Sequence, residues 1–146
     1  GRNDEDVADL VLAGRKGWKT DDLLSDVPHH LLSRIHLTGF VESEDLPRLY
    51  NLSERFVYPS IYEGFGLPPL EALVAGASVL CSDIEVFHET CSDLVSFFPL
   101  DDPSALSQLL TAPAQKPSMS TAESVCHRFN WEDSAERILW CATHCN

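Results

Sequence analysis

Two carboxylates with seven residues between them, Glu63 and Glu71, bracket a segment that opens with two glycines. Glycine lets backbone come close to a ligand. Pro68 and Pro69 suit the first turn of a helix, because proline pre-sets φ and lacks an N–H that would be unpaired there. A helix start favours an anion, and ionised carboxylates accept hydrogen bonds from hydroxyl groups. A ligand with phosphate at one place and hydroxyls at another, such as a nucleotide sugar, fits this pattern.

The flanking residues predict that this segment joins a strand to a helix. Residues 55–58 are typical of a buried strand, and apolar residues recur at helical spacing over residues 67–74. Gly76 is placed to end the helix. The fingerprint of dinucleotide-binding folds is not met, because no third glycine follows Gly64 and Gly66 at the required spacing.

Short apolar stretches alternate with helical segments along the whole chain. This alternation predicts an α/β fold, in which a Rossmann-like parallel sheet carries helices on both faces. The expected strands are residues 8–13, 35–37, 55–58, 78–81 and 95–98, and the apolar run Leu10-Val11-Leu12 predicts that the first of them is buried.

Capping residues mark several helix starts. Ser43 is expected to cap a helix with two carboxylates in its first turn, and Asp102 to begin a helix that runs to about Leu110. A further helix is expected over about residues 121–128. Asn130 precedes the last helix, with an acidic residue three positions on, as in a capping box. The apolar stripe of that helix is expected to pack against the fold: Trp131, Ala135, Ile138, Leu139 and Ala142.

Composition bounds the class of protein. A chain of 146 residues, 44% of them hydrophobic, is expected to form one domain with a real core. Its net charge of -13 argues against nucleic acid and anionic membrane surfaces as partners, because both attract basic patches. Phosphates would therefore be met locally, by helix-start amide groups and by a few cations such as Arg15, Lys16 or Lys19.

Location and metal content are also constrained. No apolar run reaches the length of a membrane span, so we expect no direct membrane insertion. Five cysteines at irregular spacing do not form a disulfide framework, which favours a reducing cytoplasm. Cys141, His144 and Cys145 lack a second ligand pair with matching spacing, so no metal site is predicted.

The central segment resembles the Glu-x7-Glu signature of the family 4 retaining glycosyltransferases, which have the GT-B fold. The resemblance spans nearly the whole chain, residues 1–146, and suggests the carboxyl-terminal, donor-binding lobe of such an enzyme. It rests on these residues: Pro59-Ser60, Glu63 to Ala72, Gly76, Gly14 to Trp18, Gly39-Phe40-Val41, Asp45 to Tyr50 and Phe129-Asn130-Trp131.

The resemblance implies roles for individual residues. Glu63 would accept hydrogen bonds from the donor sugar and stabilise positive charge at its anomeric carbon. Glu71 would accept from the ribose hydroxyls. Helix and cations would stand in for a metal, so no cofactor is expected. The diphosphate would lie against the loop formed by Gly64, Phe65, Gly66 and Leu67.

Two further loops are implied at the same ligand. Gly39 and Phe40 would lie beside the nucleotide base, although this loop also suits a plain strand-to-helix turn. Arg15 or Lys16 would face the diphosphate, and the alternative is a solvated basic loop anchored by Trp18. The Lys16-Gly17-Trp18 sequence resembles that of members using GDP-mannose or related donors.

The chain departs from the family at its first strand-helix unit, which is absent and whose strand normally lies mid-sheet. We therefore predict a lobe that binds a nucleoside diphosphate sugar for transfer of a hexose, such as mannose, to a glycan or lipid-linked acceptor. This lobe is expected to be inactive without an amino-terminal lobe or partner chain. The alternative is a non-catalytic donor-binding or interaction module. A glycosidase that uses Glu63 and Glu71 as acid and base is a weaker alternative, because a helix start does not suit a raised carboxyl pKa.

Overall fold

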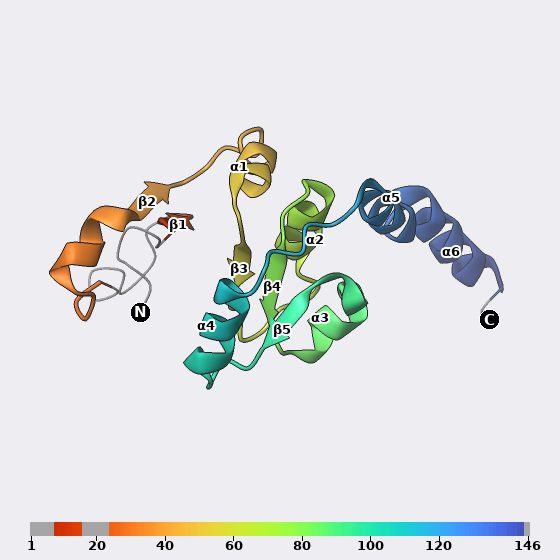
Figure 1. Ribbon diagram of the computed structural model, residues 1–146. Coiled ribbons are helices and arrows are strands. Elements are labelled where there is room, and N and C mark those ends of the chain that lie inside the picture. The colour runs from red at the N-terminus through yellow and green to blue at the C-terminus, as the bar shows by residue number, and fades with distance from the viewer. Residues whose placement is uncertain (1–7, 16–23, 145–146) are drawn as a thin grey trace. The chain divides into compact units, whose positions relative to one another are not determined.

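A computed structural model describes residues 8–15 and 24–144 of the chain. These residues fall into two compact units that divide between Leu46 and Pro47. The five expected strands are all present, and all their pairings are parallel (Figure 1). The strands form a two-stranded and a three-stranded sheet rather than one continuous sheet.

The first unit contains strands β1 (Leu10–Ala13) and β2 (Ile35–Gly39), joined by hydrogen bonds in parallel register. A short 3-10 helix, η3 (His29–Arg34), follows Pro28 and leads into β2. The expectation of a buried first strand is wrong, because Leu10 is 49% and Val11 43% exposed. One short helix beside a two-stranded sheet cannot cover the apolar residues on both faces of that sheet.

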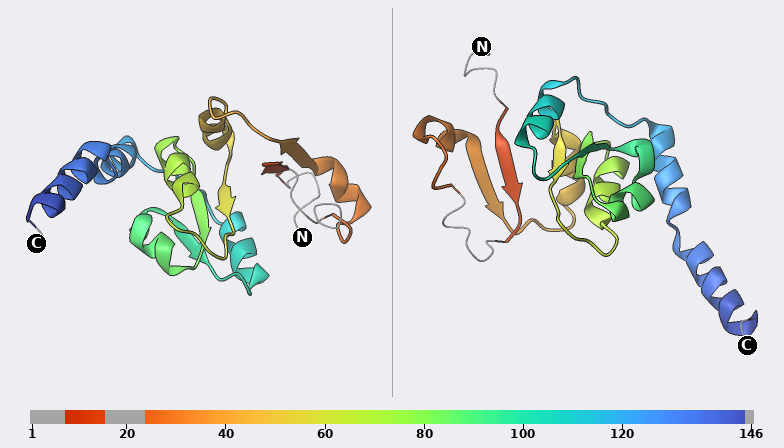
Figure 2. Two further views of the ribbon diagram at one scale, coloured as in Figure 1. Left: turned by 180° about the vertical axis from the view of Figure 1, so that it is seen from behind. Right: turned by 90° about the horizontal axis from the view of Figure 1, so that it is seen from below.

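The second unit contains the core. Strands β3 (Phe56–Tyr58), β4 (Val79–Ser82) and β5 (Ser96–Phe98) lie side by side in all views (Figures 1 and 2). Every residue of β4 is buried, as befits the central strand. Helix α2 (Leu67–Val74) contacts β3 and β4, and buries Leu70 and Leu73. Strand β3 is half-buried rather than buried, because only one of its edges is paired.

The remaining helices begin where the chain offers a cap. Asp102 accepts hydrogen bonds from the amides of Ser104 and Ala105 and starts α4 (Pro103–Thr111) as predicted. Ser118 caps α5 (Met119–Arg128), two residues earlier than expected. Between β4 and β5 lie α3 (Glu85–Thr90) and the 3-10 turn η4 (Ser92–Leu94).

The last helix, α6 (Trp131–His144), confirms the predicted cap at Asn130 and contradicts the predicted packing. Asn130 accepts from the Asp133 amide at 2.8 Å and donates to the Asp133 carboxylate at 2.8 Å. The apolar stripe is exposed instead of packed, with Trp131 89% and Ile138 70% accessible. Within the described residues, no element covers this stripe.

The helix expected after Ser43 begins two residues late. Helix α1 spans Leu46–Leu52, and no acidic residue lies in its first turn. The Asp45 amide instead donates to the Glu42 carbonyl at 2.9 Å, which closes a turn before the helix. Pro47 suits a first helical turn and so favours the later start.

Candidate functional site

The loop between β3 and α2 is shaped by Gly66. This residue is buried and has φ 82° and ψ 58°, the left-handed conformation that favours glycine. A Cβ at this position would lie 3.1 Å from Cδ1 of Phe87 and nearer still to its Cε1. The Phe87 side chain is fully buried in α3. The chain therefore turns into α2 at a place where a buried ring leaves no room for a side chain.

Four consecutive amides at this turn have no protein acceptor among the described residues. Within the described part of the chain, no hydrogen bond is made by the N–H groups of Gly64, Phe65, Gly66 and Leu67. Helix starts normally leave such donors free. Pro68 and Pro69, the next two residues of the helix, carry no N–H and add no donor. The donors available to an anion are concentrated in the loop.

Glu63 is held in this loop by two hydroxyl groups. The Tyr58 hydroxyl, at the end of β3, donates to Oε1 of Glu63 at 2.6 Å. The Ser60 hydroxyl lies 3.0 Å from the same oxygen and 3.1 Å from the Tyr62 carbonyl, so its one proton can serve either acceptor. Burial, together with the hydrogen bond to Glu63, raises the pKa of Tyr58 above its usual range. Tyr58 therefore stays a hydrogen-bond donor at neutral pH.

Glu71 lies one helical turn into α2 and is exposed. The Tyr50 hydroxyl, from α1, lies 3.5 Å from Oε2 of Glu71, a long and weak hydrogen bond. Burial, and secondarily the Glu71 carboxylate, raises the pKa of Tyr50. The ring of Phe56 packs between Tyr50 and Tyr58, at centroid distances of 4.9 and 5.9 Å. One aromatic row thus carries the hydroxyl partners of both carboxylates.

Glu71 also borders an apolar groove of about 480 Å³ within the second unit. The groove runs between α2 and α5, and Phe129 closes it at the end of α5. Its lining is Pro47, Leu67, Leu70, Glu71, Val74, Ala75, Val125, Cys126 and Phe129.

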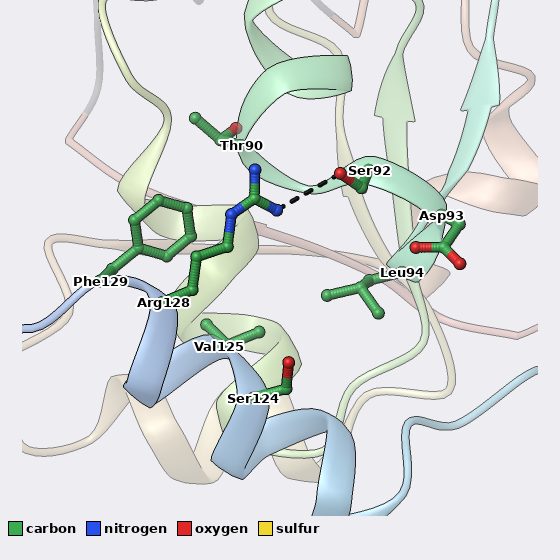
Figure 3. Close-up of a pocket in the computed structure, with 8 residues that line it drawn as sticks. All are labelled: Thr90, Ser92, Asp93, Leu94, Ser124, Val125, Arg128 and Phe129. Carbon is green, nitrogen blue, oxygen red and sulfur yellow. Dashed lines mark hydrogen bonds between the residues drawn. The ribbon is translucent and has the colours of Figure 1, made fainter.

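The loop is also braced from the carboxyl-terminal side. The Phe65 ring meets the Phe129 ring edge to face at 5.3 Å. The Arg128 guanidinium lies over the Phe129 ring at 5.1 Å and donates to Ser92 at 3.3 Å (Figure 3). Figure 3 also shows Arg128 reaching across a small cavity of about 140 Å³ toward the start of η4. The Phe129-Asn130-Trp131 motif therefore begins with a residue that touches the candidate site.

The first unit places three other predicted site residues together. The Gly14 amide donates to the Gly39 carbonyl at 2.9 Å, so the loops after β1 and β2 meet. The Arg15 guanidinium lies 4.8 Å from the centre of the Phe40 ring, which is 56% exposed. These loops follow the carboxyl ends of parallel strands, where α/β sheets bind ligands. Lys16 lies outside the described residues.

The predicted residues thus form two groups, one in each unit: Arg15, Gly39 and Phe40 in the first, and the segment from Glu63 to Glu71 in the second. The sequence reasoning missed Tyr50, Tyr58, Phe87 and Arg128 as neighbours of the second group. Of these four, only Tyr58 could have been recognised in the sequence, since a hydroxyl at the end of a strand can contact the loop that follows the strand.

Comparison with known proteins decides the family. The model of the family described as glycosyl transferases group 1 matches residues 2–121. The chain belongs to this family. O-antigen chain mannosyltransferase B of Escherichia coli is 37% identical over 136 residues, which cover 89% of this chain and 36% of that protein. The Salmonella typhimurium O-antigen chain mannosyltransferase RfbU is 27% identical, covering 88% of this chain and 37% of that one.

Solved glycosyltransferase structures confirm the GT-B fold. Sucrose-phosphate synthase from Thermosynechococcus elongatus superposes with a TM-score of 0.70 and 26% identity, over 91% of this chain and 39% of that one. HepE from Anabaena, in complex with UDP and glucose, gives a TM-score of 0.73 at 17% identity, over 92% of this chain and 40% of that one. The chain spans well under half the length of these relatives. No helix in the described residues is both long and apolar enough to cross a bilayer.

Proposed function

We propose that this glycosyltransferase chain binds a nucleoside diphosphate sugar and serves retaining transfer of a hexose to a glycan or lipid-linked acceptor. One observation carries the proposal. A half-buried carboxylate, Glu63, is adjacent in the chain to four amide groups that no acceptor in the described residues occupies. Amides suit a diphosphate, and a carboxylate suits sugar hydroxyls and the positive charge that develops at an anomeric carbon. The names of two relatives favour mannose as the hexose.

Each residue of the site then has a role in donor binding. The amides of Gly64 to Leu67 hold the diphosphate and stabilise it as the leaving group. Glu71 accepts from the ribose hydroxyls. Gly39 and Phe40 lie beside the base, and Arg15 or Lys16 adds positive charge near the phosphates. Because amides and cations meet the phosphate charge, we propose that transfer needs no metal and no cofactor.

The whole chain is proposed to act as one donor-binding lobe that needs a second lobe. Among the described residues, each sheet has a strand edge without a partner and the apolar stripe on α6 is exposed, so backbone groups and apolar surface are available to another chain segment. We propose that an amino-terminal lobe or partner chain supplies the acceptor site, and that the 146 residues alone transfer no sugar. A cytoplasmic location stays a prediction from the cysteine pattern.

Calorimetry with GDP, UDP, GDP-mannose and UDP-glucose tests the donor site. Glu71→Ala should weaken binding of the preferred nucleotide and of its sugar about equally, because the ribose loses its acceptor in both. Losing a hydrogen bond to a charged group costs about 1.5–3 kcal/mol. Glu63→Gln should spare the bare nucleotide and weaken the nucleotide sugar. Equal losses in Glu63→Gln for both ligands would contradict the sugar role.

The non-catalytic alternative is tested by turnover. The chain would be incubated with labelled sugar donors and simple acceptors, with EDTA present in one arm, while light scattering measures its mass. We expect donor binding, unaffected by EDTA, without transfer. Transfer by a stable monomer would overturn the need for a second lobe. If adding an amino-terminal lobe from a relative still gave no transfer, the binding-module alternative would be favoured.

A further inference from the structure

The Glu63 carboxylate is anchored through one of its two oxygens. Both hydroxyl donors, from Tyr58 and Ser60, approach Oε1, at 2.6 and 3.0 Å. In the described part of the chain, no donor contacts Oε2. A carboxylate that is fixed through one oxygen presents the other in a defined direction, at less entropic cost than a freely rotating side chain.

The two anchoring hydroxyls are themselves held by the core. The Tyr58 ring stacks on Phe56 and meets the buried Phe87 ring edge to face, at 5.8 Å between centroids. The Ser60 carbonyl accepts a hydrogen bond from Ser82, which is fully buried at the end of β4. Strands β3 and β4 therefore both contribute to the position of Glu63. Phe87 also presses on Gly66, so one ring supports the carboxylate and the amide turn together.

We infer that Tyr58 and Ser60 are positioning residues, which hold Oε1 of Glu63 so that Oε2 accepts a hydroxyl group of the donor hexose. This inference rests on the proposed function and deepens it. The sugar contact is made by one oxygen only, so it depends on the direction in which the carboxylate points. A bare nucleoside diphosphate has no hydroxyl at this place, and its binding is independent of both anchors.

Calorimetry with bare nucleotide and nucleotide sugar tests the inference. Tyr58→Phe keeps the ring packing and removes only the hydroxyl. It should lower nucleotide-sugar affinity about fivefold, the equivalent of one ordinary hydrogen bond, and leave nucleotide affinity unchanged. Tyr62→Phe is the matched control, because the Tyr62 side chain is 84% exposed. Ser60→Ala is a second, smaller deletion in case Tyr58→Phe does not fold, and it should act in the same direction.

The Glu63→Gln background separates positioning from stability. In that background Tyr58→Phe should have no further effect on nucleotide-sugar affinity, because the directed carboxylate is already lost. If Tyr58→Phe lowers the affinities for nucleotide and nucleotide sugar equally, or if its effect adds fully to that of Glu63→Gln, Tyr58 supports the fold and the inference is wrong.

A measurement without ligand distinguishes the ways to fail. In an NMR titration with ¹³C-labelled tyrosine, Glu63→Gln should lower the pKa of Tyr58 toward its usual value. An unchanged Tyr58 pKa would overturn the anchor itself. A further outcome is that the titration behaves as expected while wild type binds none of GDP, UDP, GDP-mannose and UDP-glucose. In that case the proposed function fails, and with it the inference that Glu63 is positioned to accept a hydrogen bond from the donor sugar.

Discussion

The Phe87 ring occupies the space in which residue 66 would carry a side chain. Its Cδ1 atom lies 3.1 Å from an ideal Cβ at Gly66, tighter than almost all real contacts of such an atom. The same glycine has φ 82°. Two independent constraints, backbone conformation and side-chain packing, therefore act at the start of α2.

Gly66→Ala should destabilise the fold by about 1–3 kcal/mol, because the methyl group overpacks against Phe87 and the left-handed backbone is strained. Urea unfolding measures the loss. Gly64→Ala is the control, since a Cβ there would meet nothing within 4 Å and Gly64 has no positive φ. Equal losses in the two variants would show that the Phe87 contact is not what requires glycine.

Asp102→Ala should cost about 1 kcal/mol by removing the cap of α4. Its Oδ1 atom accepts from the Ser104 amide at 2.9 Å and from the Ala105 amide at 3.2 Å, and both donors would lose their partner. Asp101→Ala, in the preceding exposed position, changes the charge equally without touching the cap. Thermal unfolding compares the two, and identical midpoints would contradict the capping role.

Stability should fall at alkaline pH through Tyr58. Burial raises the folded-state pKa of its phenol, so above the ordinary value near 10 the unfolded chain loses this proton first. The contribution is fully present below pH 10 and is lost as pH rises toward the folded pKa. Tyr58→Phe should show a smaller loss of unfolding free energy between pH 8 and pH 10.5 than wild type does, with Tyr62→Phe as control. A loss in Tyr58→Phe as large as in wild type would assign the pH dependence to other groups.

The sequence predicted what depends on neighbours along the chain. The strand positions, the stop at Gly76 and the Asn130–Asp133 capping box all follow from residues a few positions apart. The exposure of a residue could not be predicted in this way, because burial depends on which other segments cover it. Leu10 and Trp131 belong to apolar patterns typical of a core, and both are exposed. The expected cap at Ser43 was wrong, because the helix begins at Leu46, where Pro47 suits its first turn.

The candidate site divides along the same line. Glu63, Glu71 and the glycines between them could be found from spacing, since they lie within nine residues of each other. The contacts of Phe87 with Gly66 and of Phe129 with Phe65 join segments far apart in the sequence. No periodicity of apolar residues predicts such contacts. Tyr58 is an intermediate case. The sequence places its hydroxyl near Glu63, but the direction of the side chain is set by strand β3.

Every β-ladder in the described chain joins strands that follow one another in sequence: β1 with β2, β3 with β4, and β4 with β5. Each ladder can therefore close as soon as its second strand leaves the ribosome, without waiting for distant residues. Contacts of short sequence separation favour rapid folding, and units generally fold in the order of synthesis. The turn at Gly66 is synthesised before the Phe87 ring that presses on it. The Gly66 turn is thus completed only once α3 has emerged, and the contact of Phe65 with Phe129 can form only after α5 has followed.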